Sequence, residues 1–273
     1  MCIVKPIVTG DLERLSIHKS LGNIFPECKF LVPTKTDSIT SNSLPDPKTS
    51  DYRENCQELA KTAITAMEDK SGDRPDMVLI VEDLELCNLD QPQIVIQWVC
   101  RSIREVLETE YSSQHHRERA AQRIRETVSF HLLSPMVEAY FFADRNSLTL
   151  AQVPDPCDLH LVSDDLEAFE TNHPGYLQSE PRRAVDQPGR HPKNFIRYLS
   201  GGSYRESKHG TGALINLNWN NLNRGAFGSQ LIRSMFEDVA DVAGVQNPIG
   251  GPISELTYPT RSTNRNLLTL RNV

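Results

Sequence analysis

The run MVLIVED at Met77–Asp83 constrains the fold more than any other part of the chain, because it is apolar on successive residues and then ends in acidic side chains. Strands without alternation between apolar and polar residues are typical of parallel sheets that helices cover on both faces. Short strand-like runs also occur at residues 3–9, 28–33 and 127–133. The run therefore predicts a central parallel strand of an α/β sheet.

Helical periodicity between these runs gives the alternation of strand and helix that parallel strands require. We expect helices at residues 11–25 with Asp11 as N-cap, at 52–69, over 92–126 with an interruption near 111–116, and at 135–148, 191–200 and 227–243. Residues 34–51 read as a loop and 151–190 as an excursion over the surface. The predicted fold is α/β, with a mainly parallel, Rossmann-like sheet flanked by helices.

We expect one compact unit rather than two independent domains. We expect an α/β core over residues 1–150, which includes the basic helical stretch 92–126, and a helical C-terminal elaboration over 151–273 that packs on this core. The tail after Gly250 shows no pattern.

The composition limits the classes of partner. The 273 residues carry 29 basic and 36 acidic side chains, a net charge of −7, which excludes a broadly basic nucleic-acid coat but not a local basic groove. No apolar run is long enough to cross a membrane, and the first residues lack the pattern of a signal peptide, so we expect a cytoplasmic protein without membrane contact. The cysteines have no C-x-x-C spacing and read as reduced thiols rather than zinc ligands: Cys2, Cys28, Cys56, Cys87, Cys100 and Cys157.

Acidic side chains follow two of the predicted strands. Asp11 and Glu13 come after the first strand, and Glu82, Asp83 and Glu85 lie at the end of MVLIVED. Functional residues of open α/β sheets gather at the carboxyl ends of the strands. Several carboxylates there would suit Mg²⁺ or Mn²⁺. The alternative is that these acids only solvate a strand end and cap the helix that follows.

Several segments resemble the motifs of a known family. VTGDLE (Val8–Glu13) resembles the opening V-E-G-x-x-E motif of TOPRIM-type domains, and IVEDLE (Ile80–Glu85) resembles their acidic D-x-D strand end. SPMVEAYFFAD (Ser134–Asp144) and HPKNFIRYLSGGSYRESKHG (His191–Gly210) resemble two later motifs, and the helix expected at 227–243 takes the place of a closing helix. Together these segments resemble the DUF4276 family, bacterial and archaeal proteins with a TOPRIM-like core, over most of residues 3–243.

The resemblance implies a site that acts on phosphodiesters with Mg²⁺ or Mn²⁺. Glu13 matches the second acid of the opening motif, and Asp83 and Glu85 match the D-x-D pair, so these three are expected to hold the metal and to act in catalysis. Lys193 or Lys208 would stabilise charge that develops in the transition state. Thr9 replaces the first glutamate of the opening motif, and a hydroxyl is a poor base and a weak ligand.

Further residues are candidates for contact with substrate: Glu138, His191, Lys208 and, in the basic stretch, Arg119 and Arg123. Each has a structural alternative, because Glu138 could be one polar position on a helix, His191 a helix cap, and the basic residues a solvated face. Arginines along a helix also match the charges of a nucleic-acid backbone. Arg182, Arg183 and Arg190 could extend such a surface.

Two functions are compatible with the sequence. The first is a metal-dependent, nuclease-type subunit that works with a partner ATPase in prokaryotic antiviral defence and acts on DNA or RNA. The second is a catalytically inactive TOPRIM-like subunit that binds or regulates within such a complex. The remaining acids and Lys193 favour the first, whereas Thr9 and the acidic net charge favour the second.

Overall fold

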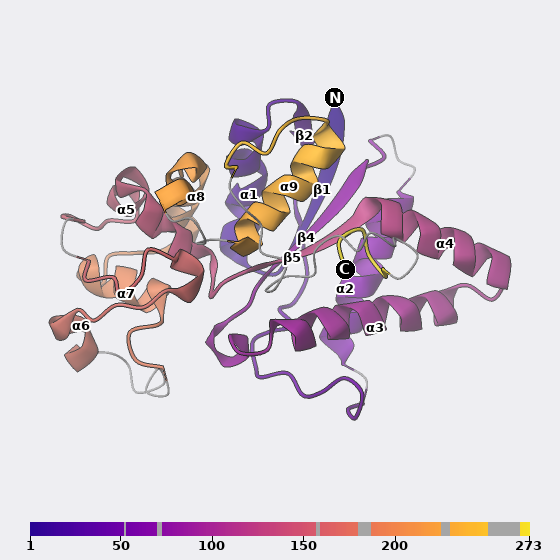
Figure 1. Cartoon of the computed structure of the whole chain (residues 1–273), viewed down its shortest axis with the longest axis horizontal. Helices are drawn as coiled ribbons and strands as arrows, with labels where there is room; N and C mark the ends of the chain where they lie inside the picture. The colour runs from indigo at the N-terminus through magenta and orange to yellow at the C-terminus, as the bar shows by residue number, and fades with distance from the viewer. Residues whose placement is uncertain (52, 70–72, 157–158, 180–186, 225–229, 251–267) are drawn as a thin grey trace.

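A parallel sheet forms the centre of the protein. The computed structural model describes residues 1–273 apart from 52, 70–72, 157–158, 180–186, 225–229 and 251–267. Its strands are β1 (Cys2–Val8), β2 (Cys28–Phe30), β3 (Thr34–Lys35), β4 (Met77–Asp83) and β5 (Val128–Leu133). All pairings between them are parallel, in the order β2-β1-β4-β5 with β3 also beside β1 (Figure 1). The predicted α/β fold with a parallel sheet is confirmed.

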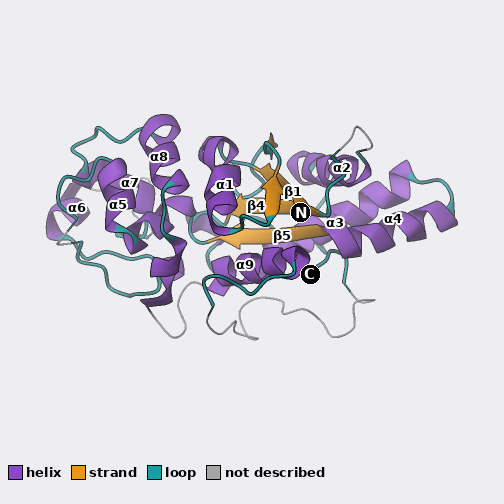
Figure 2. Ribbon diagram, turned by 90° about the horizontal axis from the view of Figure 1, so that it is seen from above, coloured by secondary structure: helices purple, strands orange, loops and turns teal. Residues whose placement is uncertain are grey.

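The helices surround the sheet and extend beyond both ends of it. The α-helices are α1 (Asp11–Ile24), α2 (Glu54–Glu68), α3 (Pro92–Glu110), α4 (Gln114–Thr127), α5 (Arg145–Leu150), α6 (Pro174–Ser179), α7 (Pro192–Leu199), α8 (Thr211–Ile215) and α9 (Gln230–Ala243). Helices α5 to α8 gather at one end of the molecule, and α3 and α4 project at the other (Figures 1 and 2). Strand β5 leads into the group of α5 to α8. Because the strands are parallel, the carboxyl ends of the central strands also face this group of helices.

Successive residues of β4 enter two different hydrophobic clusters, which explains why the strand shows no alternation in its sequence. Leu79 and Val81 belong to the cluster that contains α1 and α9, whereas Val78 and Ile80 belong to the cluster of α2 and α3. The first cluster continues through α5 to α8, and it therefore joins residues on both sides of position 150.

The chain near residue 272 covers the outer edge of β5. The side-chain amide of Asn272 accepts a hydrogen bond from the Phe130 N–H (3.0 Å) and donates one to the Phe130 carbonyl oxygen (2.7 Å). The backbone N–H of Arg271 donates to the Val128 carbonyl oxygen at 2.7 Å. These contacts satisfy backbone groups that an edge strand would otherwise leave exposed.

The structure corrects two local predictions. The helix expected at 135–148 is instead a 3₁₀ segment, η2 (Val137–Ala143), followed by α5, because Asp144 leaves helical geometry and its carboxylate caps α5 by accepting from the Asn146 N–H at 3.2 Å. Asp11 is not the N-cap of α1: Gly10 takes that position, and Asp11 is the first helical residue, where its charge favours the helix dipole.

Several other sequence predictions meet the structure only in part. The excursion at 151–190 is anchored in the core by Phe169 and Tyr176, which are almost fully buried. Cys157, Arg182 and Arg183 lie outside the described residues, and the other five cysteines are free thiols. Among the helices that the structure describes, none has the length and apolar content needed to cross a membrane.

Candidate functional site

A pocket of about 150 Å³ lies at the carboxyl ends of β1 and β4, where the sheet meets α7. Acidic side chains dominate its lining, which consists of Thr9, Gly10, Asp11, Leu12, Glu13, Ser38, Ser41, Asp83, Glu85, Glu138, Lys193 and Glu206. Since a water molecule occupies about 30 Å³ in the liquid, the pocket has room for an ion and a phosphate-sized group.

Glu13 projects from the first turn of α1 into this pocket and is only 4% exposed. Its carboxylate lies so close to Gly10 that a β-carbon at position 10 would overlap Oε2, so a larger residue there would make the carboxylate shift. Burial raises the pKa of Glu13 to about 8, with a further contribution from Glu138, while Lys193 opposes the rise. The side chain is therefore poorly compensated as an anion.

Asp83 and Glu85 enter the pocket from the end of β4. Asp83 Oδ1 accepts a hydrogen bond from the Val137 N–H at 2.9 Å, which ties the strand end to η2. Burial raises the pKa of Asp83, and the negative charges of Glu13 and Glu85 raise it further. Burial also raises the pKa of Glu85, against the attraction of Lys193.

The backbone at Glu85 is strained. Its φ of 60° and ψ of 154° fall in a region that residues other than glycine rarely adopt, at a cost of about 1–3 kcal/mol. The neighbouring backbone holds this conformation, because the Leu84 N–H donates to Leu133 and the Glu85 N–H donates to Pro135, each at 2.8 Å. Strain that the surroundings enforce is concentrated at functional sites in proteins, so the geometry supports a functional role for Glu85.

A second set of charged side chains enters from the helical end of the molecule. Lys193 Nζ lies 3.7 Å from Glu138 Oε1 and 3.3 Å from Glu206 Oε2. Glu138 is 1% exposed, and its Oε1 also accepts a hydrogen bond from the Tyr204 hydroxyl at 3.3 Å. Glu206 in turn pairs with Arg197 at 3.0 Å. Glu138 thus faces the pocket and is not a polar position on an exposed helix face.

The charges of this second set act on one another. Burial raises the pKa of Glu138, and Lys193 counteracts the effect. Burial alone would lower the pKa of Lys193, but Glu138, Glu206 and Asp83 together raise it above the usual range of a lysine. Lys193 is therefore a permanent cation among the carboxylates.

Glu82 takes part in the structure around the pocket and not in the pocket itself. Its Oε1 accepts hydrogen bonds from the Thr40 hydroxyl at 2.6 Å, the Ser38 hydroxyl at 2.8 Å and the Ile39 N–H at 3.1 Å. Burial raises the pKa of Glu82, and the hydrogen bonds, first that of Thr40, oppose this. Glu82 therefore fixes the loop that contributes Ser38 and Ser41 to the pocket wall.

The structure does not bring the remaining predicted residues into the pocket lining. His191 caps α7, since its Nδ1 accepts from the Asn194 N–H at 3.4 Å, and burial lowers its pKa to about 4. Lys208 is exposed on the π-helical turn Glu206–Gly210. Arg119 and Arg123 lie on α4, which enters β5 at its amino end, and Arg123 donates to the Met67 carbonyl oxygen at 2.9 Å. Any contact they make with nucleic acid would be on a separate surface.

Sequence reasoning missed Glu206. It reaches the pocket through the π-helical turn that follows the positive-φ residues Gly201 and Gly202. A glutamate in a polar segment carries no periodic signal. The nearest signal in the sequence for a place in the pocket is that Glu206 lies two residues after Tyr204. In the structure the Tyr204 hydroxyl contacts Glu138.

The carboxylates fit the chemistry of a hard divalent cation, which prefers oxygen ligands. As placed, however, no three Asp, Glu, His or Cys side chains within the described residues are grouped closely enough to hold a metal ion. The predicted Mg²⁺ or Mn²⁺ site therefore stays a prediction, and it would require the side chains to shift.

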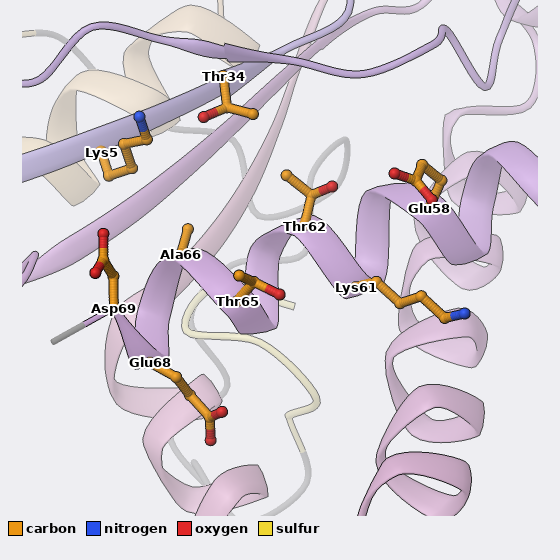
Figure 3. A pocket seen from close by; sticks show the side chains of 9 residues that line it. All are labelled: Lys5, Thr34, Glu58, Lys61, Thr62, Thr65, Ala66, Glu68 and Asp69. Carbon is orange, nitrogen blue, oxygen red and sulfur yellow. The ribbon is translucent and has the colours of Figure 1, made fainter. Parts of the chain in front are cut away.

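A wider cavity of about 730 Å³ lies along α2, at the side of β1 and β3. Figure 3 shows its acidic side chains and Lys61 spread along the helix, with Lys61 and Glu68 on different turns, and Lys5 on the strand opposite. Lys5 on its wall donates to the Val32 carbonyl oxygen at 2.7 Å. Because these groups do not converge, this cavity is a weaker candidate for a catalytic or metal-binding site than the acidic pocket.

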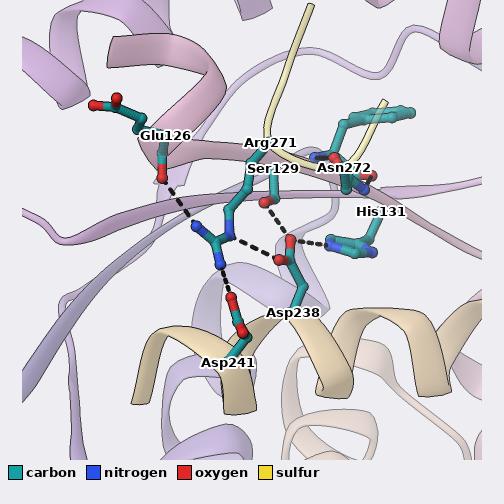
Figure 4. A network of polar contacts seen from close by, with 8 residues as sticks. Glu126, Ser129, His131, Asp238, Asp241, Arg271 and Asn272 are labelled. Atoms are coloured by element: carbon teal, nitrogen blue, oxygen red, sulfur yellow. Dashed lines mark hydrogen bonds and ion pairs between the residues drawn. The ribbon is translucent and has the colours of Figure 1, made fainter. Parts of the chain in front are cut away.

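A serine, a histidine and an aspartate also meet between β5 and α9, as Figure 4 shows. Both Ser129 Oγ and His131 Nε2 contact Asp238 Oδ2, and Arg271 Nε donates to Asp238 Oδ1 at 2.8 Å. A nucleophilic triad places histidine between serine and aspartate, whereas here the aspartate is in the middle and all three side chains are buried. The group reads as a structural network that fastens Arg271 to the sheet.

In comparisons with known proteins, no protein-family model, no curated protein and no solved structure matches this chain. The function of the chain is therefore inferred from its acidic pocket.

Proposed function

We propose that the acidic pocket performs metal-dependent chemistry on phosphodiesters, as a nuclease-type subunit. The observation that carries this proposal is that Glu13, Asp83 and Glu85 line one pocket together with the cation of Lys193, at the carboxyl ends of two adjacent strands. Glu13 and Asp83 have raised pKa values because burial is poorly compensated. A divalent cation would supply the missing positive charge.

Each side chain has a role in this proposal. Asp83, Glu85 and Glu13 would hold Mg²⁺ or Mn²⁺, which would polarise the phosphate and make water a better nucleophile. Lys193 would contact a phosphate oxygen and offset the negative charge of the transition state. A bound cation would offset the burial that raises the pKa of Glu13 and would keep this ligand ionised.

The setting of this activity follows from the resemblance to DUF4276 and is part of the proposal. The chain would act in the cytoplasm with a partner ATPase in antiviral defence, on DNA or RNA. The lining of the pocket has no aromatic side chain on which a base could stack, which favours recognition of the phosphate backbone over recognition of sequence.

A binding or regulatory subunit without catalysis is the second candidate. The observation that favours it is Thr9, a buried hydroxyl in the pocket wall at the position where the TOPRIM motif has a glutamate. In that case Lys193 would serve as the permanent counter-charge of the acids, and no metal would enter.

A cleavage assay separates the two candidates. Purified protein is incubated with single- and double-stranded DNA and RNA in the presence of Mg²⁺, Mn²⁺ or a chelator. The nuclease proposal expects metal-dependent cleavage that Asp83→Ala abolishes and Asp90→Ala preserves, because Asp90 is exposed and outside the pocket lining. Cleavage that survives Asp83→Ala would refute the site assignment. Absence of cleavage with every substrate and metal would favour the binding subunit.

A further inference from the structure

Lys193 is positioned between two acidic groups that differ in exposure. Its Nζ is 3.7 Å from the buried Glu138 and 3.3 Å from Glu206, whose side chain is 34% exposed. The lysine side chain itself is 24% exposed. One cation therefore spans the distance from the interior of the pocket to its rim.

Both acidic partners are held independently of the lysine. Glu138 accepts a hydrogen bond from the Tyr204 hydroxyl at 3.3 Å. Glu206 pairs with Arg197 at 3.0 Å. Because each carboxylate keeps another partner, Lys193 can leave either of them without isolating a charge completely. The arrangement is suited to a side chain that moves.

The inner acids need more positive charge than Lys193 provides. Among the described side chains, no Lys, Arg or His forms an ion pair with Glu13, Asp83 or Glu85. Glu13 is 4% exposed, its carboxylate receives no hydrogen bond from another described residue, and Gly10 leaves room for it at the pocket. A buried acid that only its own backbone N–H contacts, at the wall of a cavity, points to a cation that completes the site.

We propose that Lys193 couples the binding of a divalent cation to the binding of a phosphodiester at this pocket, an inference that rests on the function proposed above. Without ligands, the ammonium group is the counter-charge of the inner acids. When the cation binds, it repels the ammonium group from Glu138. The displaced lysine then lies at the rim beside Glu206, which Arg197 already neutralises in part, and the phosphate adds a second anion for the ammonium group there.

The coupling follows from electrostatics at short range. A cation that enters alone must face the charge of Lys193, which costs more in this partly buried pocket than in water. A phosphate that enters alone meets an excess of carboxylates. Each ligand therefore removes the main obstacle to the other, and by linkage the factor by which phosphate strengthens cation binding equals the factor in the reverse direction.

The test measures binding rather than cleavage. Mn²⁺ is titrated into the full chain and the free ion is followed by electron paramagnetic resonance, with and without dimethyl phosphate as a phosphodiester probe. We expect dimethyl phosphate to strengthen Mn²⁺ binding to the wild type by roughly tenfold, as couplings between sites usually amount to about 5- to 150-fold. Lys193→Met should bind Mn²⁺ roughly tenfold more tightly than the wild type without the probe and should gain nothing from it.

Lys193→Arg is the matched control, since it retains the charge and should keep both the weaker binding and a response to dimethyl phosphate. Equal Mn²⁺ affinity in the wild type and in Lys193→Met would overturn the coupling while leaving the metal site intact. Absence of Mn²⁺ binding in all three proteins would overturn the metal-dependent function as well. If Lys193→Met does not fold, the wild-type titration decides, because an unchanged affinity with dimethyl phosphate refutes the proposal.

Discussion

Replacing Glu13 by glutamine should remove a pH dependence from the stability of the protein. Burial raises the pKa of Glu13 from 4.5 in the unfolded chain to about 8 in the folded protein. The folded state therefore keeps this proton to higher pH than the unfolded chain does. The contribution of Glu13 to stability is complete below pH 4.5 and is lost as the pH rises through about 8.

The size of the effect follows from the shift. At about 1.4 kcal/mol per pKa unit, the rise from 4.5 to about 8 sets a ceiling of about 5 kcal/mol. Asp83 and Glu138 remain in the pocket of the variant and still repel one another. We therefore expect the free energy of unfolding of Glu13→Gln, relative to the wild type, to increase by about 2 kcal/mol between about pH 5 and about pH 9.

Urea unfolding at a series of pH values, followed by circular dichroism in the presence of a chelator, measures this difference. Glu58→Gln is the control, because Glu58 is an exposed glutamate on α2. Its stability should follow the wild type at every pH. If the pH profile of Glu13→Gln is parallel to that of the wild type, the reasoning about the buried carboxylate is wrong.

Three further substitutions test other parts of the structure. Arg271→Ala leaves a buried aspartate without its guanidinium partner and should lower the free energy of unfolding by roughly 3 kcal/mol, measured in urea; a loss below about 1 kcal/mol would contradict this. Phe236→Ala opens a cavity between two aromatic rings and should cost about 3–5 kcal/mol by calorimetry, with Val32→Ala, at the surface, costing far less. Glu82→Ala should speed hydrogen exchange at the amides of Ile39 and Thr40, which lose the carboxylate as acceptor. Unchanged exchange would argue against the role of Glu82 in fixing this loop.

The sheet could be predicted because its signals are local. β4 is buried on both faces, and this burial is visible directly as an apolar run without alternation. The end of the helix expected at 135–148 was not predictable in the same way. Asp144 breaks that segment because its carboxylate bonds both the Asn146 N–H and the Asn218 N–H, and the second contact comes from 74 residues away.

The residues of the candidate site likewise differ in whether local sequence predicts them. Glu13, Asp83 and Glu85 could be proposed from the sequence, since the ends of parallel strands meet at one edge of a sheet. Glu206 could not, because it arrives through an irregular turn. The strain at Glu85 was equally hidden, since the contacts that enforce it come from the end of β5 and from Pro135.

The contacts of Arg271 and Asn272 with the outer edge of β5 have a consequence for folding. Phe130 and Asn272 are 142 positions apart, so the strand forms its outermost contacts with a segment that is synthesised much later. Until that segment arrives, an apolar strand with open backbone groups is available to neighbouring chains, a known route to aggregation. During synthesis the protein should therefore depend most on chaperones between the emergence of β5 and that of residues 270–273, and shortened chains that lack these residues should aggregate first.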